Sequence, residues 1–326
     1  MSPIASPGAG RSAAAVRLPG IDAMRYLAFC AVVVLHTPKF GAGARIDELM
    51  RFAVPFYFIS AGYFLARAPA ELGAAMSQKA QRLLVPYALW FVVYAVVYGV
   101  NPDSRTPLGV LQWFVTGGAG FHLWFLPALL LCDCVMLALR RRLVAAAVLA
   151  AALYLVGLCL GPYFGALGGS SPLIWDIRNG PFFGFIFVVA GFAMSKASVR
   201  PNLMLSLLVV GSGLAISELE IGLLKSLHQL QHSGSEFLLG TLPLGVGAFW
   251  LAMSLPDRVM VRAVARLGGY SMGCYCIHLL VLRFLIGAIA PHNNLTSFAE
   301  ALGAIVGATL LVVALGQARV LRPLLR

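Results

Sequence analysis

The sequence predicts an all-α fold: a polytopic integral membrane helical bundle of about ten transmembrane helices, with both termini cytoplasmic. Three observations lead to this prediction. The 326 residues are 60% hydrophobic and only 11% charged, with a mean hydropathy of +0.88, whereas a soluble domain of this length needs a more polar surface. Apolar runs long enough to cross a bilayer recur along the chain. Lys and Arg are concentrated in alternate loops between those runs.

The apolar runs follow one another to the end of the chain. Ahead of them, residues 1–17 (MSPIASPGAGRSAAAVR) are rich in Pro, Gly, Ala and Ser, which predicts a disordered N-terminal tail. They lack the continuous apolar stretch of a signal peptide, so the first run is predicted to be a retained span. No fixed-period repeat or Pro/Ser-rich linker divides residues 18–326, which form one predicted transmembrane domain. The predicted spans are 21–38, 50–67, 83–100, 122–139, 143–162, 181–196, 203–222, 237–254, 268–289 and 298–316.

The loops between these spans differ in charge from one side of the membrane to the other. With a cytoplasmic N-terminus, 16 of the 24 Lys and Arg residues fall in inside segments and six in outside segments. The remaining two, Arg25 and Arg283, lie within spans. A missed span would scramble this alternation, so the charges support the number of spans as well as the orientation. Because the basic residues are dispersed over short loops, the net charge of +12 does not indicate a nucleic-acid partner.

The cysteines do not suggest a disulfide framework or a metal site. All six lie within apolar runs, and none belongs to a CxxC pair. Thiols inside apolar helices act as small packing residues. We therefore expect neither disulfides nor a cysteine-bound metal.

The first span, within IDAMRYLAFCAVVVLHTPKF, contains two ionisable side chains, Arg25 and His36. In an α-helix their separation corresponds to about 16 Å of rise and about three turns, so both project from one face. Arginine is the usual binder of phosphate groups, and histidine is the usual general base near neutral pH. The alternative interpretation is that Arg25 extends to lipid headgroups and His36 lies at the outer interface.

Two more stretches add candidate residues. The second span, RFAVPFYFISAGYFLAR, places Ser60 and Gly62 among aromatic residues, where small residues favour close helix packing. In the predicted loop after it, KAQRLLVPY places Lys79 and Arg82 on one face at the cytoplasmic mouth of the third span. A loop of this kind is ordinary for the positive-inside rule. Beside Arg25, however, it would form a basic cluster.

Two further stretches add candidates towards the outer half. FHLWFLPALL places His122 and Trp124 at the outer interface, where an aromatic belt explains Trp124 better than His122. The ninth span, GGYSMGCYCIHLLVLRFL, places His278 near the middle of the membrane and Arg283 closer to the outside. Two ionisable side chains in one span are a functional hypothesis by default.

Taken in order, these five stretches resemble the motifs of the acyltransferase family 3 membrane proteins. Arg25, ten residues and His36 are similar to the Arg/His pair of the family's first helix. VPFYFISAGYF resembles its Val-Pro-Phe-Phe-x-x-Ser-Gly-Phe/Tyr, KAQRLLVPY its basic-x-x-Arg…Pro-Tyr, HLWFLPALL its His-Leu-Trp-Phe-Leu, and YSMGCYCIHLLVL its closing Ser-x-Gly-x-Tyr-x-x-His-x-x-Leu. The resemblance extends over residues 21–282 and is nearest to members that O-acetylate surface glycans. Two departures are Ala61, which separates the serine from the glycine, and Lys79, which replaces an arginine and loses a bidentate phosphate ligand.

The resemblance implies an O-acyltransferase of the bacterial inner (plasma) membrane. The donor would be cytoplasmic acetyl-CoA, with no metal, and the acceptor a hydroxyl of a surface or periplasmic glycan or lipid-linked saccharide, in contact with membrane lipid. The coenzyme would be held by Arg25, Lys79 and Arg82. His36, with Arg25 as the second catalytic residue, would act as general base or be transiently acylated. The residues expected to line the channel, stabilise the oxyanion or orient the acceptor are Ser60, His122, Trp124 and His278.

Two alternatives stay open at this point. A proton-coupled transporter of a small anionic solute would use His36, His278 and the intramembrane arginines as relays or ligands. The lack of paired Gly/Pro-interrupted helices counts against it. A sensor or fused-enzyme membrane module would use the same scaffold without acylation. The sequence does not distinguish acetyl from succinyl, identify the acceptor or give the oligomeric state.

Overall fold

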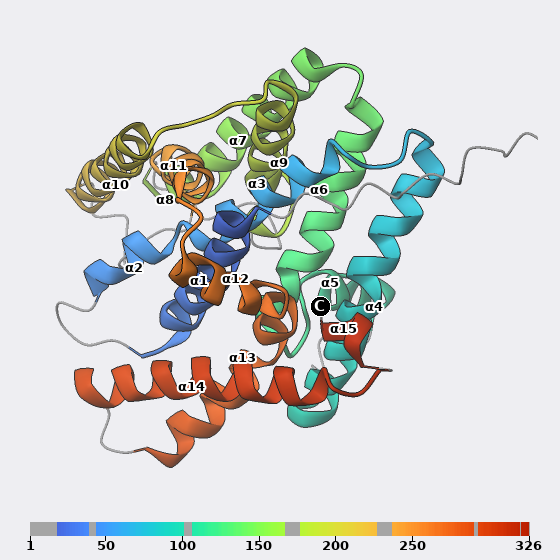
Figure 1. Cartoon of the computed structure of the whole chain (residues 1–326), viewed down its shortest axis with the longest axis vertical. Helices are drawn as coiled ribbons and strands as arrows, with labels where there is room; N and C mark the ends of the chain where they lie inside the picture. The colour runs from blue at the N-terminus through green and yellow to red at the C-terminus, as the bar shows by residue number, and fades with distance from the viewer. Residues whose placement is uncertain are drawn as a thin grey trace, which may run out of the picture.

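The computed structural model describes residues 18–38, 44–100, 106–166, 177–226, 237–289, 293–319 and 321–325, and every regular element in these ranges is a helix (Figure 1). The predicted tail, residues 1–17, lies outside them. The elements are α1 (Pro19–His36), α2 (Ala44–Met50), α3 (Ala53–Leu65), α4 (Leu72–Tyr98), α5 (Pro107–Val115), η3 (Phe121–Trp124), α6 (Phe125–Leu139), α7 (Leu143–Leu160), α8 (Pro162–Ala166), η4 (Ile177–Asn179), α9 (Pro181–Lys196), α10 (Leu203–Ser226), α11 (Thr241–Ser254), α12 (Val259–Gly268), α13 (Ser271–Ala288), α14 (Asn294–Leu315) and α15 (Arg322–Leu325).

Each of the ten predicted spans coincides with a helix. Within the described ranges, seven helical segments are long and apolar enough to cross a membrane. The other three predicted spans correspond to α3, α9 and α11, which have 13, 16 and 14 residues. The chain is therefore a multi-pass helical membrane protein. That all ten helices cross the bilayer, and that both termini are cytoplasmic, stay predictions.

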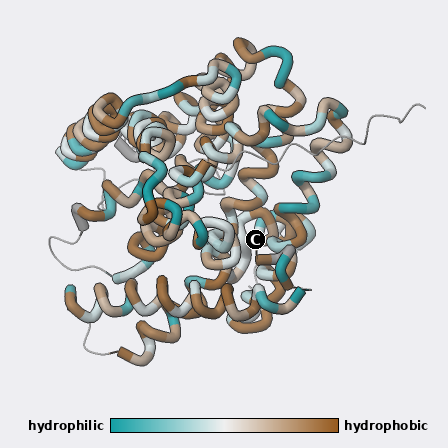
Figure 2. Tube along the Cα trace, viewed as in Figure 1, coloured by the Kyte–Doolittle hydropathy of each residue, from teal (hydrophilic) through white to brown (hydrophobic). Residues whose placement is uncertain are grey.

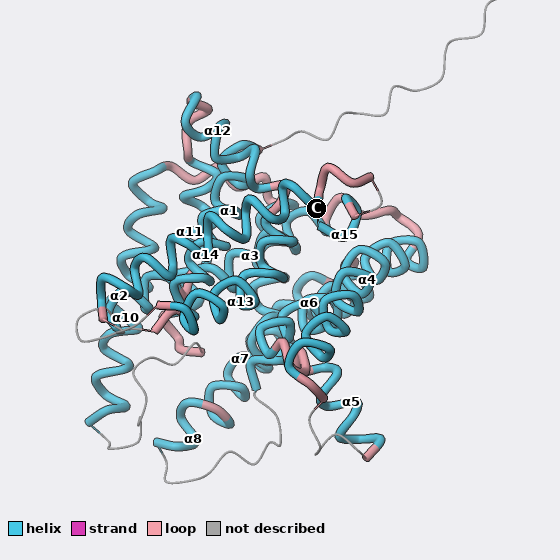
Figure 3. The backbone as a smooth tube through the Cα atoms, turned by 90° about the horizontal axis from the view of Figure 1, so that it is seen from below, coloured by secondary structure: helices cyan, strands magenta, loops and turns pink. Residues whose placement is uncertain are grey.

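Short helices lie at the two ends of the bundle. In Figure 3, α12 and α15 lie at one end and α5 and α8 at the other. The sequence predicted cytoplasmic segments where α12 and α15 are found, and outer segments where α5 and α8 are found. Helix α12 packs tightly on the start of α1, since a Cβ on Gly268 would lie 2.1 Å from the carbonyl oxygen of Asp22.

Helix α4 begins earlier than the sequence predicted. It has 27 residues and starts at Leu72 rather than at residue 83, so the predicted loop that carries Lys79 and Arg82 is in fact helical. At 1.5 Å per residue, α4 is about 40 Å long, which exceeds the hydrocarbon thickness of a bilayer. Its polar first turns therefore extend past the apolar layer, and a search for apolar runs alone leaves them out.

The outer surface of the bundle is apolar. Side chains such as Val96, Val144 and Leu219 are exposed at 79%, 79% and 75%. In Figure 2, brown hydrophobic residues recur along peripheral helices such as α10 and α14. Exposure of this extent fits contact with lipid and not with water.

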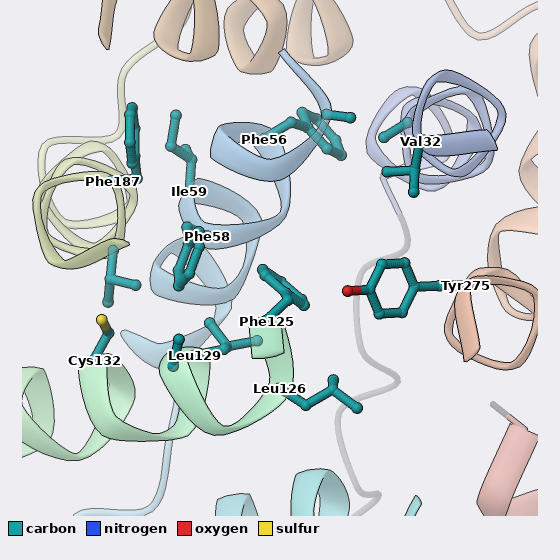
Figure 4. Packing of buried hydrophobic residues seen from close by; sticks show 14 of the residues in the cluster. Val32, Phe56, Phe58, Ile59, Phe125, Leu126, Leu129, Cys132, Phe187 and Tyr275 are labelled. Atoms are coloured by element: carbon teal, nitrogen blue, oxygen red, sulfur yellow. The ribbon is translucent and has the colours of Figure 1, made fainter. Parts of the chain in front are cut away.

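Aromatic side chains from several helices fill the centre. Phe58 on α3 and Phe125 on α6 meet edge to face with their ring centroids 4.9 Å apart, and the ring of Tyr275 on α13 approaches Phe125 at 5.8 Å (Figure 4). Phe187 on α9 lies on the other side of α3. Helix α3 is thus packed between α1, α6 and α9, so its polar residues lie inside the protein.

Glycines allow α3 and α9 to cross closely. A Cβ on Gly62 would lie 2.0 Å from the carbonyl oxygen of Val188, and one on Gly191 would lie 2.0 Å from that of Ile59. At each glycine the backbone of the other helix therefore packs where a side chain would otherwise lie. This crossing gives Gly62, displaced by one residue from the family pattern, a packing role.

The cysteines agree in part with the prediction that they are small packing residues. All six are free thiols, and Cys132, Cys274 and Cys276 are buried. These three fill space between helices, whereas Cys159 is exposed.

Candidate functional site

Helix α1 carries Arg25 near its start and His36 as its last residue. The helix is unbroken between them, so their separation along the axis is about 16 Å. The two side chains belong to separate groups of residues at opposite ends of α1.

Arg25 is held by α1 and α3. Its Nη1 donates to Asp22 Oδ1 at 3.1 Å, and its Nε and Nη2 lie 3.3 and 3.2 Å from Ser60 Oγ. The guanidinium also lies over the Phe64 ring at 5.0 Å, and the Tyr57 hydroxyl donates to the Arg25 carbonyl at 2.7 Å. Ser60 thus belongs with Arg25 and not with the histidines. Asp22 fixes the guanidinium and offsets part of its charge.

Lys79 and Arg82 lie one turn apart on α4 but differ in surroundings. Lys79 Nζ is 2.9 Å from Asp133 Oδ2 on α6, with Asp133 fully buried and the Lys79 side chain 21% exposed. Arg82 is exposed, and its positive charge is near enough to repel that of Arg25. The predicted basic cluster therefore has carboxylate partners for two of its three cations.

Sequence reasoning assigned no role to Asp22 or Asp133. Asp133 did carry a signal, because it is the one acidic residue within the predicted span 122–139. An acid inside a membrane span is expected to have a partner or a function. Which cation it pairs with depends on how α4 packs against α6.

Three histidines from distant parts of the chain meet at the other end of α1. The His36 ring stacks on that of His278 with centroids 5.4 Å apart and an interplanar angle of 25°. The His122 ring meets His278 edge to face at 4.9 Å. We call His36, His122 and His278 the histidine cluster. His36 is partly exposed, whereas His122 and His278 are buried.

Backbone carbonyls of α13 hold the two buried rings. His278 Nδ1 lies 2.5 Å from the carbonyl oxygen of Tyr275, and His122 Nε2 lies 3.3 Å from that of Cys276. The Cys276 carbonyl also accepts from the Tyr94 hydroxyl at 2.9 Å, while the Tyr275 hydroxyl donates to the carbonyl of His122. Successive carbonyls of one helix thus orient both rings.

A tight turn before η3 positions His122 beside His278. Gly117 has a positive φ of 91°, and a Cβ there would lie 2.7 Å from the Gly120 carbonyl oxygen. Only glycine adopts such a conformation without strain. The turn leads directly into η3, so His122 and Trp124 enter the bundle in one short 3-10 helix.

The remaining predicted residues, Trp124 and Arg283, each take part in a cation–π contact. Trp124 is buried, and the guanidinium of Arg178 lies over its ring at 5.5 Å. Phe121 packs edge to face on His36 at 5.4 Å. Arg283 is exposed and lies over the Tyr98 ring at 4.9 Å. In the described ranges, no group of three His, Cys, Asp or Glu side chains is placed to hold a metal ion.

Curated relatives are similar to part of this chain. An amino-acid racemase of Enterococcus faecalis is 28% identical over 228 residues, which is 60% of this chain and 32% of that protein. A serine/alanine racemase of Enterococcus gallinarum is 30% identical over 213 residues, 56% of this chain and 30% of that protein. The match thus covers about a third of the length of each racemase. No solved structure matches the chain.

The family comparison covers almost the whole chain. The family described as "Acyltransferase domain", acyltransferase family 3, matches residues 18–317. This range includes the Arg25 group, the Lys79–Asp133 pair and the histidine cluster. The chain therefore belongs to acyltransferase family 3.

Proposed function

We propose that this chain is an acyltransferase, and that it moves an acetyl group from cytoplasmic acetyl-CoA to a hydroxyl group of a glycan or lipid-linked saccharide at the opposite face of the bacterial inner membrane. The observation that carries the proposal is the histidine cluster at the far end of α1 from Arg25. His36 is a base and Arg25 a phosphate-binding cation, and they lie about 16 Å apart on one helix. This arrangement suits a donor whose nucleotide stays at the cytoplasmic face of the membrane. Its long, thin pantetheine arm would bring the thioester towards the other face.

The donor end supplies positive charge for the coenzyme phosphates. Arg25, Lys79 and Arg82 are the cations proposed to bind them. Asp22 and Asp133 already pair with two of these cations. Bound phosphate would therefore share or replace the carboxylates as hydrogen-bond acceptors.

The chemical step is proposed at His36, the partly exposed ring of the histidine cluster. The acceptor hydroxyl oxygen attacks the thioester carbonyl carbon, so that a C–O ester bond forms and the C–S bond breaks. His36 takes the hydroxyl proton as general base and returns it to the leaving thiolate, giving CoA. In the second possible order, His36 is acylated first and then passes the acyl group to the hydroxyl.

The proposal does not extend racemisation to this chain. About two thirds of each racemase lies outside the matched region.

The proposal is tested by acyl transfer with purified protein, radiolabelled acetyl-CoA and a crude cell-envelope glycan fraction. We expect the wild type to label the glycan and His36→Ala to lose at least about 100-fold of the rate, as removal of a general base does. Phe284→Ala serves as the control, because Phe284 is 75% exposed on α13 and should leave transfer unchanged. Equal transfer by correctly folded His36→Ala would sink the role given to His36.

Orientation is tested separately by labelling single cysteines introduced at His36 and at Lys79. A membrane-impermeant thiol reagent applied from the periplasm should label the first position and not the second. The opposite pattern would reverse the orientation and remove the argument for a cytoplasmic donor at Arg25.

A further inference from the structure

Two ring nitrogens of the histidine cluster make no hydrogen bond to any group in the described part of the chain. They are His122 Nδ1 and His278 Nε2, on side chains whose exposure is 2% and 0%. Buried polar atoms of folded proteins almost always have a hydrogen-bond partner. Two ring nitrogens without a hydrogen-bond partner, in adjoining rings whose centroids are 4.9 Å apart, therefore indicate that a ligand binds here.

The α13 backbone fixes which nitrogen of each ring carries the proton. A carbonyl oxygen can only accept, so His278 Nδ1 and His122 Nε2 must be the N–H groups that face Tyr275 and Cys276. In a neutral imidazole the second nitrogen then carries a lone pair. His122 Nδ1 and His278 Nε2 are consequently both hydrogen-bond acceptors.

A pair of acceptors restricts the chemistry of a ligand. An anion such as a carboxylate or phosphate group would present lone pairs to lone pairs. A ligand with one hydroxyl would satisfy one nitrogen and leave the other bare. Aromatic rings pack against the pair, since Tyr94 lies 5.1 Å from His122 and Phe29 lies 6.4 Å from His278, ring centroid to ring centroid. Largely apolar walls with a few fixed polar atoms are typical of small-molecule sites.

We propose that His122 Nδ1 and His278 Nε2 accept hydrogen bonds from two hydroxyl groups of one acceptor molecule, while His36 acts on the hydroxyl that is acylated. The proposal rests on the proposed function and deepens it. It narrows the acceptor to a polyhydroxylated, sugar-like molecule with neighbouring free hydroxyls and excludes a lipid alcohol with a single hydroxyl. It also gives His278 an accepting role, which is incompatible with donation from Nε2 to an oxyanion.

The test measures KM separately for the glycan fraction and for acetyl-CoA. His122→Phe and His278→Phe keep a ring but remove the nitrogens, and each should raise the glycan KM about tenfold or more while the acetyl-CoA KM stays constant. His122→Asn and His278→Gln return an amide oxygen near the position of the bare nitrogen and should recover part of the loss. Phe284→Ala on the same helix is the control. Unchanged glycan KM in both phenylalanine variants would overturn the proposal.

Two further measurements use wild-type protein, so they do not depend on how the variants fold. Glycan treated with periodate, which cleaves neighbouring diols, should lose acceptor activity about tenfold or more, and undiminished transfer would overturn the requirement for two hydroxyls.

In protein labelled with 15N-histidine, NMR should find opposite tautomers for His122 and His278, and the signals of the nitrogens without a partner should shift on addition of glycan. Identical tautomers, or no shift, would also overturn it. If wild-type protein transfers no label to any glycan, the proposed function falls first and this inference with it.

Discussion

The Lys79–Asp133 pair predicts unequal effects for substitution of its two partners. Asp133 is fully buried on α6, whereas the Lys79 side chain is 21% exposed. Lys79→Met would leave a carboxylate without its counter-charge in apolar surroundings. Asp133→Leu would leave an ammonium group on a flexible stem that can turn towards the aqueous phase.

The magnitude follows from the geometry. At the N–O distance of 2.9 Å, Coulomb's law gives about 6 kcal/mol for an effective dielectric constant of about 20. The exposure of Lys79 screens the pair, and a discount to about half that value accounts for it. We expect Lys79→Met to lower the free energy of unfolding by about 3 kcal/mol and Asp133→Leu by about 1 kcal/mol. The double variant should lose less than Lys79→Met alone, because it leaves no unpaired charge.

Thermal unfolding in detergent micelles, followed with a thiol-reactive fluorophore, measures the order of stabilities. Cys132 is buried next to Asp133 and becomes reactive when α6 separates from its neighbours. Equal losses for the two single variants, or a double variant whose loss is the sum of both, would refute the reasoning. The same variants also distinguish a role of Lys79 in stability from a role in coenzyme binding. If Lys79 also binds phosphate, the double variant recovers stability but not the KM for acetyl-CoA.

Three other predictions concern the close crossing of α3 and α9, the donor end and an acidic residue on α2. Gly62→Ala would place its Cβ 2.0 Å from a carbonyl oxygen of α9, so it should lower the melting temperature markedly, whereas Gly211→Ala, with nothing within 4 Å of its Cβ, should not. Arg25→Lys should raise the KM for acetyl-CoA about tenfold by losing the forked guanidinium, as transfer kinetics would reveal. Burial raises the pKa of Glu48 above its ordinary 4.5, so the folded state binds its proton more tightly and stability falls as pH rises above about 4.5. Glu48→Gln should reduce that fall in melting curves recorded from pH 4 to pH 8.

Much of the helical framework was predictable because membrane-crossing helices are encoded locally. A run of apolar residues of the right length is sufficient to place a helix, and every predicted span overlaps one. The predicted start of α4 was wrong because residues 72–82 contain polar residues, which end an apolar run, and yet they are helical. Helix α12 was missed for the same reason, since it lies in a segment that the charges identified only as an inside loop.

The sequence predicted which residues belong to the site better than it predicted how they are arranged. Intramembrane histidines and arginines stand out one by one in an apolar sequence. That His122 lies against α13 depends on a contact between residues 154 positions apart, which no local pattern encodes. Likewise, Ser60 was recognisable as a polar residue in α3, but its hydrogen bond to Arg25 depends on the crossing of α1 and α3.

The dependence of both buried histidines on main-chain carbonyls has a consequence for how this protein tolerates variation. Any residue at position 276 supplies the same carbonyl, so the Cys276 side chain can change without altering the proton position on His122. An insertion or deletion before Tyr275 would instead rotate α13 by about 100° per residue. His122 would then lose the Cys276 carbonyl. His278 would keep the Tyr275 carbonyl, because both belong to α13, but its ring would turn away from His36 and His122. Variation among homologues should therefore appear at this helix as substitutions and not as changes in length.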